Sequence, residues 1–178
     1  MMHLILKLLR RIYEMILEKG STEQRVSYLR KKGIKIGQNC IINIMNFSTE
    51  PYLVEIGNNV RIASGTQFIT HDGSIRCFHD EIPGGVFGKI KIGNNVFIGI
   101  NCIVVLNTTI GDNCIIGAGS VVRGQFPDNS VIVGNPAKVI SSINIQKMFF
   151  RNNPGFVKTN NLNEKEKDLI VKKHFGIK

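Results

Sequence analysis

The fold of this chain is decided by residues 92–122, which read IGNNVFIGINCIVVLNTTIGDNCIIGAGSVV. An aliphatic residue returns at every sixth position of this stretch, namely at Ile92, Ile98, Val104, Ile110, Ile116 and Val122. A glycine follows most of these positions, and a compact side chain stands four residues after them. Since no single helix or strand has a six-residue period, the repeat describes the unit of a solenoid. Three units make a triangular coil of eighteen residues, with the aliphatic side chains inside and glycine or asparagine at the corners.

The same register appears earlier in the chain. Ile56, Ile62 and Phe68 keep the six-residue step, and the 36 residues from Ile56 to Ile92 are six whole units. An earlier turn that starts at Ile36 is out of step by two residues, which predicts a small bulge or loop around residues 46–51. Ordinary hairpin loops would give irregular spacings, so the strict period favours a mainly β protein built as a parallel β-helix.

Helical segments flank the predicted coil. We expect an N-terminal helical segment at residues 1–33, the β-helix at 34–140 with a loop extruded near 71–89, and a C-terminal helical tail at 141–178. Ser21 and Gln24 have the spacing of a capping box, which predicts a helix from Ser21 to Gly33. A second capped helix is predicted from Glu164 to His174, after Asn163.

Composition narrows the range of partners. The chain has 178 residues and a net charge of +10, which indicates an anionic partner. Aromatic residues make up only 7% and no nucleic-acid-binding motif is present, which argues against nucleic acid. A phosphate-rich cofactor, an anionic saccharide or an acidic membrane surface would use the charge equally well. Cys40, Cys102 and Cys114 occupy compact interior positions, and no signal peptide precedes them, so we expect free thiols in a reducing cytoplasm.

The first helix is apolar from Leu4 to Leu17 but carries Lys7, Arg10, Arg11 and Glu14, so it cannot span a bilayer. One helical face collects five aliphatic residues, with the cations on the other side: Ile5, Leu8, Leu9, Ile12 and Ile16. This pattern fits a helix that lies on a membrane surface. It also fits a helix that packs against the β-helix or a neighbouring subunit, and of the two interpretations the sequence favours this packing.

Chemistry is expected where the repeat is interrupted, between Phe68 and Ile90. This segment holds two of the four histidines, His71 and His79, within the runs THDG and CFHDE. Loops on a rigid scaffold are the usual carriers of function, and histidine side chains act as general bases near neutral pH. His71 stands where a strand leaves the repeat, so it is the candidate base.

Three runs resemble the hexapeptide-repeat acyltransferases, a family that includes the galactoside, maltose, xenobiotic and serine acetyltransferases. They are IGNNVFIG at 92–99, IGAGSVV at 116–122 and GNPAKVI at 134–140. Two further runs, EPYLVEIG at 50–57 and FITHDG at 68–73, look most like the branch that acetylates capsule, exopolysaccharide or lipopolysaccharide sugars. The resemblance covers roughly residues 33–140.

This resemblance implies a left-handed coil, a homotrimer, and acetyl-CoA bound in the groove between subunits, with no metal. It implies an O-acetyltransferase in which a loop histidine deprotonates a sugar hydroxyl, and the hydroxyl then attacks the thioester directly. The matching histidine is His71, with Asp72 or another nearby carboxylate as its orienting partner. The family's cofactor contacts map to Asn101, Ala118, Arg123 and Lys138. Many relatives read Val-Thr-Lys where this chain has Val122-Arg123-Gly124, so Arg123 would replace the lysine as a phosphate contact.

Other functions stay open at this point. An N-acetyltransferase acting on a nucleotide-linked amino sugar is the nearest alternative, and a non-enzymatic β-helix binding protein is another. A zinc carbonic anhydrase of this fold needs three histidines on adjacent coils, whereas His71 and His79 share one loop. A Cys77 nucleophile would form an acyl-enzyme, but no neighbouring residue marks it as activated.

Overall fold

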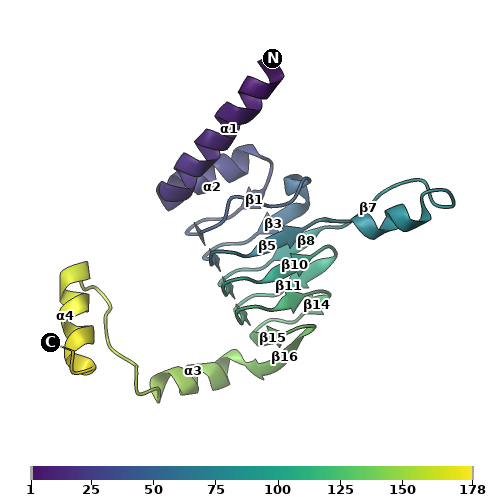
Figure 1. The fold of residues 1–178 in the computed structure, drawn as a ribbon. Helices are drawn as coiled ribbons and strands as arrows, with labels where there is room; N and C mark the ends of the chain where they lie inside the picture. The colour runs from purple at the N-terminus through teal and green to yellow at the C-terminus, as the bar shows by residue number, and fades with distance from the viewer. Residues whose placement is uncertain (1, 178) are drawn as a thin grey trace. The chain divides into compact units, whose positions relative to one another are not determined.

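The computed structural model describes residues 2–177, and the chain divides into two compact units, Met1–Ile143 and Asn144–Lys178. The first unit contains two helices followed by stacked β-coils (Figure 1). The second unit contains helices α3 (Ile143–Arg151) and α4 (Glu164–His174). The capping box predicted at Asn163 is present, with Glu166 as its second member. No helix within residues 2–177 is long and apolar enough to cross a membrane.

Three sheets form the faces of the coil, and we name them A, B and C. Sheet A contains β1 (Lys35–Ile36), β3 (Val54–Ile56), β8 (Ile90–Ile92), β11 (Thr108–Ile110) and β14 (Gln125–Phe126). Sheet B contains β2 (Ile41–Ile42), β4 (Arg61–Ile62), β9 (Phe97–Ile98), β12 (Ile115–Ile116), β15 (Ser130–Gly134) and β16 (Ala137–Ser142). Sheet C contains β5 (Gln67–Ile69), β10 (Ile103–Val105) and β13 (Val121–Val122). Within these sheets only β16 runs antiparallel to its neighbour.

The predicted six-residue period is confirmed by the strand register. Ile92 pairs with Ile110 and Val104 with Val122, so the coils of this stretch advance by eighteen residues. Ile56 pairs directly with Ile92, which shows that the register survives the interruption between them. The repeated aliphatic side chains are buried in one continuous core. Each contributes about 1.5–3 kcal/mol of burial free energy, so the column of stacked side chains is the main source of stability.

Asparagine and glycine turn the corners, as predicted. Asn95, Asn101 and Asn113 have φ of 55°, 56° and 55°, a left-handed conformation that asparagine tolerates better than most residues. The side-chain amide of Asn95 donates to Asn113 Oδ1 at 3.1 Å and accepts from Asn59 at 3.0 Å. The corner between sheets A and B is therefore linked from coil to coil by an amide ladder.

The chain loops out of the coil in two places, and the last coil is shorter than eighteen residues, because Ile110 pairs with Phe126 and Ile116 with Ile132. Residues 43–50 contain no strand and lead into the short 3-10 helix η1 (Pro51–Leu53), in agreement with the loop predicted at 46–51. The second departure joins β5 to β8 and contains β6 (His71–Asp72), the 3-10 helix η2 (Gly73–Phe78) and β7 (Val86–Phe87). β6 and β7 pair as an antiparallel ribbon. Figure 1 shows this segment projecting sideways from the coil.

Helix α2 (Thr22–Lys31) closes the N-terminal end of the coil. The predicted capping box of Ser21 and Gln24 is present, and Gly33 follows the helix with a φ of 97°. Leu29 is buried in the core of the coil. Arg25 is 8% exposed and donates to the carbonyl of Ile42 at 2.9 Å, which ties the helix to strand β2. The exposed edges of the first coil are thereby covered.

Helix α1 (Met2–Lys19) precedes α2 and contacts it through the rings of Tyr13 and Tyr28, whose centroids are 5.7 Å apart. The aliphatic side chains predicted to share one face are all exposed: Ile5, Leu8, Leu9, Ile12 and Ile16. The side chains of the cations predicted opposite them lie outside the described part of the chain: Lys7, Arg10 and Arg11.

Candidate active site

His71 stands where the chain leaves the coil. Ile69 still pairs with Val105 in sheet C, and Thr70 is fully buried. The next residue begins β6, and the loop returns at Gly88, whose N–H donates to the carbonyl of Thr70 at 2.9 Å. The stacked coils therefore fix the backbone of His71, while its side chain stays 41% exposed. A rigid scaffold thus presents a solvent-accessible imidazole.

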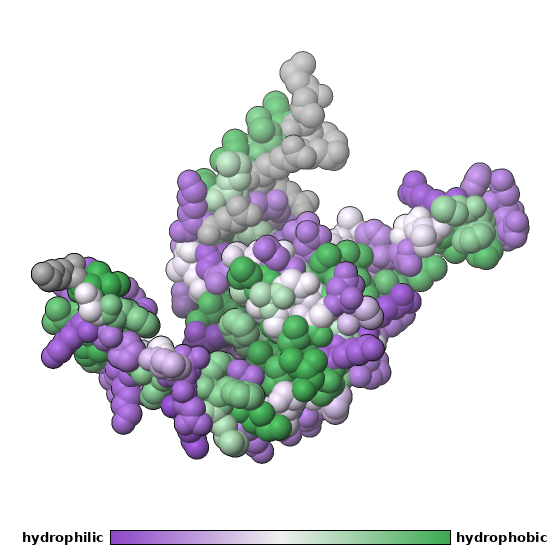
Figure 2. All heavy atoms as spheres, turned by 60° about the horizontal axis from the view of Figure 1, so that its bottom comes forward, coloured by the Kyte–Doolittle hydropathy of each residue, from purple (hydrophilic) through white to green (hydrophobic). Residues whose placement is uncertain are grey.

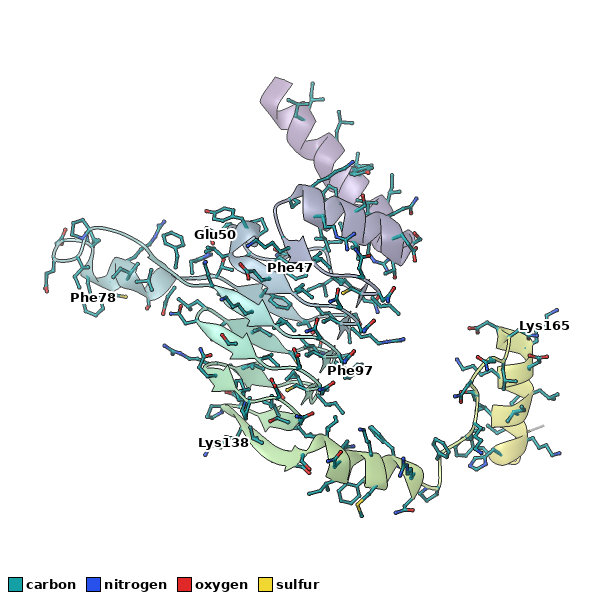
Figure 3. The ribbon with its side chains drawn as sticks, turned by 180° about the vertical axis from the view of Figure 1, so that it is seen from behind. Phe47, Glu50, Phe78, Phe97, Lys138 and Lys165 are labelled. Atoms are coloured by element: carbon teal, nitrogen blue, oxygen red, sulfur yellow. The ribbon has the colours of Figure 1, made fainter. Side chains whose placement is uncertain are left out.

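A carboxylate from the first departure of the coil contacts this imidazole. Oε2 of Glu50 lies 3.0 Å from Nδ1 of His71. Figure 3 shows Glu50 on the side of the coil from which the loop projects. The hydroxyl of Thr49 donates to Oε1 of Glu50 at 2.6 Å, and that of Thr70 donates to Oε2 at 2.7 Å. Both irregular segments of the chain therefore meet at one cluster of polar groups.

The same contacts keep Glu50 ionised. Hydrogen bonds from Thr49 and Thr70, followed by the hydrogen bond and charge of His71, lower the pKa of Glu50 from 4.5 to about 2 against the opposing effect of partial burial. An ionised carboxylate only accepts hydrogen bonds, so we assign the imidazole proton to Nδ1. The lone pair of the neutral ring is then on Nε2. In this tautomer Nε2 can accept a proton from a bound ligand.

His71 lines two surface hollows, and a third lies next to them. One of about 400 Å³ is lined by Asn46, Phe68 and His71, and one of about 410 Å³ by His71, Arg76 and Phe87. A third, of about 740 Å³, reaches from Ser48 and Thr49 to residues of the N-terminal helices. Volumes of this size suit small ligands. The imidazole is thus open to two reactants that approach from different sides.

Asp72, predicted as a partner of His71, has a different role in the structure. Its Oδ1 accepts from the backbone N–H of Ser74 at 2.9 Å and from the hydroxyl of Ser74 at 2.7 Å, which caps η2. These bonds, with a smaller contribution from the charge of Arg123, lower the pKa of Asp72. The carboxylate that contacts His71 in the structure is therefore Glu50, whereas Asp72 bonds to Ser74 within the loop.

Sequence reasoning did not single out Glu50. It lies 21 positions before His71 in the segment with no repeat, so neither period nor proximity links the two residues. The signal available was the out-of-step spacing near residues 46–51, which marked an irregular segment without indicating which side of the coil it would face.

Two of the predicted cofactor residues share one edge of sheet C. Asn101 turns the corner between sheets B and C, and Ala118 occupies the same corner one coil later, where Gly119 donates to the carbonyl of Ile100 at 2.9 Å. Lys138 is exposed on β16 and pairs with Val133, close to the end of sheet B that leads to this corner. These three residues therefore lie toward the B–C edge.

Arg123 lies on the opposite edge of sheet C. It follows Val122, which pairs with Val104, so it lies in the row of Val105 and Ile69 and at the edge that carries His71. Within one subunit, Asn101 and Ala118 are therefore separated from His71 by the width of sheet C.

The other polar groups of the loop do not join this cluster. Nε2 of His79 lies 3.0 Å from Oδ1 of Asp80, and both side chains are largely exposed. Cys77 is an exposed free thiol. Within residues 2–177 no three His, Cys, Asp or Glu side chains gather closely enough to hold a metal ion.

Comparison with known proteins adds independent observations. Residues 89–124 match the family described as bacterial transferase hexapeptide (six repeats). The chain is 40% identical over 168 residues to Protein CapG of Staphylococcus aureus, covering 92% of this chain and 96% of that protein. It is 35% identical over 140 residues to galactoside O-acetyltransferase of Escherichia coli K12, covering 77% of this chain and 68% of that protein. A hexapeptide-repeat acetyltransferase of Vibrio cholerae, solved with acetyl coenzyme A, has a TM-score of 0.52 at 27% identity and covers 62% of this chain and 61% of that one.

Proposed function

Because this chain belongs to the hexapeptide-repeat acetyltransferases, enzymes that use acetyl-CoA, we propose that it transfers an acetyl group to a sugar hydroxyl in surface polysaccharide biosynthesis. The observation that carries the proposal is the contact of 3.0 Å between Glu50 and His71, at an imidazole that opens into two hollows. The similarity to a galactoside O-acetyltransferase supports a sugar hydroxyl as the acceptor. Residues 34–140 would form the acyltransferase domain.

The proposed reaction is a direct transfer. Nε2 of His71 takes the proton of the sugar hydroxyl, and the oxygen attacks the thioester carbon of acetyl-CoA. The tetrahedral intermediate collapses as the carbon–sulfur bond breaks, and His71 returns its proton to the departing thiolate. The negative charge of Glu50 stabilises the imidazolium that exists between these two proton transfers. Backbone N–H groups of a neighbouring coil would stabilise the oxyanion.

We further propose that the site is completed by a second subunit of a left-handed, trimeric assembly. Asn101 and Ala118 lie on one edge of sheet C, and His71 lies on the other. A closed ring of three subunits would bring the first edge of one chain against the second edge of its neighbour. Acetyl-CoA would then lie in the groove between them, with Lys138 and Arg123 near its phosphates.

The direct test is acetyl transfer from acetyl-CoA to a panel of hydroxyl sugars and amino sugars, read by mass spectrometry. The expected product is an ester, whose added acetyl mass disappears after treatment with hydroxylamine at alkaline pH. A product that resists this treatment is an amide and would establish the N-acetyltransferase alternative. An enzyme that binds acetyl-CoA yet modifies none of the sugars would overturn the assignment of the acceptor.

Assembly is tested separately. Light scattering should give three times the chain mass of 19.9 kDa. A His71→Ala chain and an Asn101→Asp chain, each weak alone, should regain activity when they are refolded together. Mixed trimers contain some sites whose two halves are both intact, whereas a site within one chain would show no such complementation.

A further inference from the structure

Helix α1 carries an apolar surface that the described chain leaves uncovered. Five side chains form what we call the α1 apolar face, and they are 45–62% exposed: Ile5, Leu8, Leu9, Ile12 and Ile16. At 100° per residue they lie on one side of the helix. Figure 2 shows apolar side chains along this helix. Contiguous apolar surface of this kind marks a site of interaction.

The other side of α1 is already occupied. Leu17 is buried, and the carboxylate of Glu14 accepts from the hydroxyl of Tyr28 at 2.6 Å and from Lys32 at 2.9 Å. The carbonyl of Gly20, just after the helix, accepts from Arg25 at 2.6 Å. These contacts fix the C-terminal part of α1 on α2, so the α1 apolar face is not available for packing onto the coil.

Charge identifies the occupant of this face. The sequence of α1 contains four basic residues and two acidic ones, and one of the acidic residues, Glu14, is neutralised by Lys32. The chain as a whole carries a net charge of +10. A second copy of this basic helix would be repelled, whereas an anionic lipid surface attracts it. We propose that α1 docks in the plane of an anionic bilayer, with its apolar face inserted among the lipids.

The position of α1 beside the site extends this proposal to the substrate, a step that rests on the proposed function. Glu14 of α1 lines the hollow of about 740 Å³, together with Lys32 and Tyr52. That hollow shares Ser48 and Thr49 with the hollow that contains His71. Helix α1 would therefore lie between a docked membrane and this hollow, which keeps the site close to the membrane surface, and the acceptor would be a sugar carried on a lipid.

Docking is tested without any catalytic assay, by sedimentation of the full chain with vesicles. Vesicles of phosphatidylcholine mixed with phosphatidylglycerol should bind the protein, and vesicles of phosphatidylcholine alone should bind it at least about tenfold more weakly, because basic residues prefer anionic lipid. Added salt should weaken the binding to the mixed vesicles. Equal binding to both vesicle types would overturn the role of charge.

The variant Ile5→Ser/Leu9→Ser/Ile12→Ser removes apolar side chains that are already exposed, so it should fold normally and lose binding at least about tenfold. Met148→Ser/Phe149→Ser, on the exposed surface of α3, is the matched control and should retain binding. An equal loss in both variants would overturn the assignment to α1. A lower oligomeric mass of the α1 variant would show that a second copy occupies this face.

The acceptor is tested with one sugar in two forms, as a soluble methyl glycoside and as a long-chain alkyl glycoside held in anionic vesicles. The native chain should acetylate the vesicle form faster, and the α1 variant should lose this preference while it keeps its rate on the soluble form. Equal rates on both forms would overturn the lipid-carried acceptor. If the vesicles bind the protein but neither glycoside is acetylated, the proposed function fails while the docking surface stands.

Discussion

Two corners of the same edge of the coil behave differently. After Val105 the chain turns at Asn107, whose φ is 62°, and enters β11 at once. After Ile69, the register partner of Val105, it leaves the coil at His71 and returns only at Gly88. The closed corner uses the left-handed backbone of its asparagine to make the turn. The open corner presents its polar side chain to solvent, next to a carboxylate. The repeat therefore supplies stability, and its interruption holds the candidate site.

The sharpest test of this comparison exchanges the two corner residues for alanine. His71→Ala should lower the rate of acetyl transfer by about 10²–10⁴-fold, the usual contribution of a positioned general base, with binding of acetyl-CoA almost unchanged. Asn107→Ala should leave the rate intact but lower the free energy of unfolding by about 1–2 kcal/mol, since alanine tolerates a left-handed conformation poorly. Transfer assays and thermal melts separate the two effects. Full activity in His71→Ala would move the base to another residue.

The second test compares a carboxylate of the site with one of the coil. Glu50→Gln should lower the turnover number by about 10–100-fold, the equivalent of one hydrogen bond to a charged group. Glu55→Gln, which breaks an exposed pair with Lys35 on sheet A, should leave the turnover number unchanged. Equal turnover numbers for the two variants would exclude Glu50 from the site.

Glu50 also makes stability depend on pH. Its pKa is lowered from 4.5 to about 2, so the stabilisation is fully present above pH 4.5 and is lost as the pH falls toward 2. Unfolding by denaturant between these pH values should show a smaller loss of stability in Glu50→Gln than in the native chain. An identical acid dependence would mean that Glu50 is not held as an ion by its hydrogen bonds.

A third test compares glycines of the coil and the loop. A Cβ added at Gly57 would come within 2.6 Å of the carbonyl oxygen of Gly93 in the next coil, and backbone cannot move aside cheaply. Gly57→Ala should therefore lower the free energy of unfolding by about 1–3 kcal/mol. A Cβ at Gly73, in the loop, meets no atom within 4 Å, so Gly73→Ala should be neutral in the same denaturant titration. Equal effects would show that coil spacing adapts to added volume.

The fold could be predicted from the sequence because its cause is periodic. Every sixth side chain enters the core and each corner repeats the same backbone conformation, so a residue such as Ile98 or Asn113 reports its place directly. His71 was predicted for the complementary reason, since it stands where the period stops. The irregular segment at residues 43–50, before η1, has no period. The contact of Glu50 with His71 depends on how this segment and the loop after β5 meet, and the spacing of residues in the sequence does not predict that.

Asp72 shows that adjacency in the sequence is also a poor guide to contacts in the site. It adjoins His71 in sequence, but adjacent residues of a strand point to opposite sides. Its carboxylate instead caps η2 through Ser74. The predicted cofactor residues are a second example. Strand register places Arg123 beside the open corner of sheet C and Asn101 at the opposite edge. The sequence motifs identified these residues, but their positions relative to His71 follow only from how the strands of successive coils pair.

The smallest expected effect concerns Arg123, a side chain on the regular coil at the edge of the open corner. If it contacts a phosphate of acetyl-CoA, Arg123→Ala should raise the Michaelis constant for acetyl-CoA by up to about fivefold, the limit for an exposed ion pair. The turnover number should hardly change, because the phosphates are remote from the thioester. Arg61→Ala, on the exposed face of sheet B, is the control and should alter neither constant. An unchanged Michaelis constant in Arg123→Ala would assign the phosphate contact to Lys138. The edge of sheet C that carries His71 would then take part in acetyl transfer but not in phosphate binding.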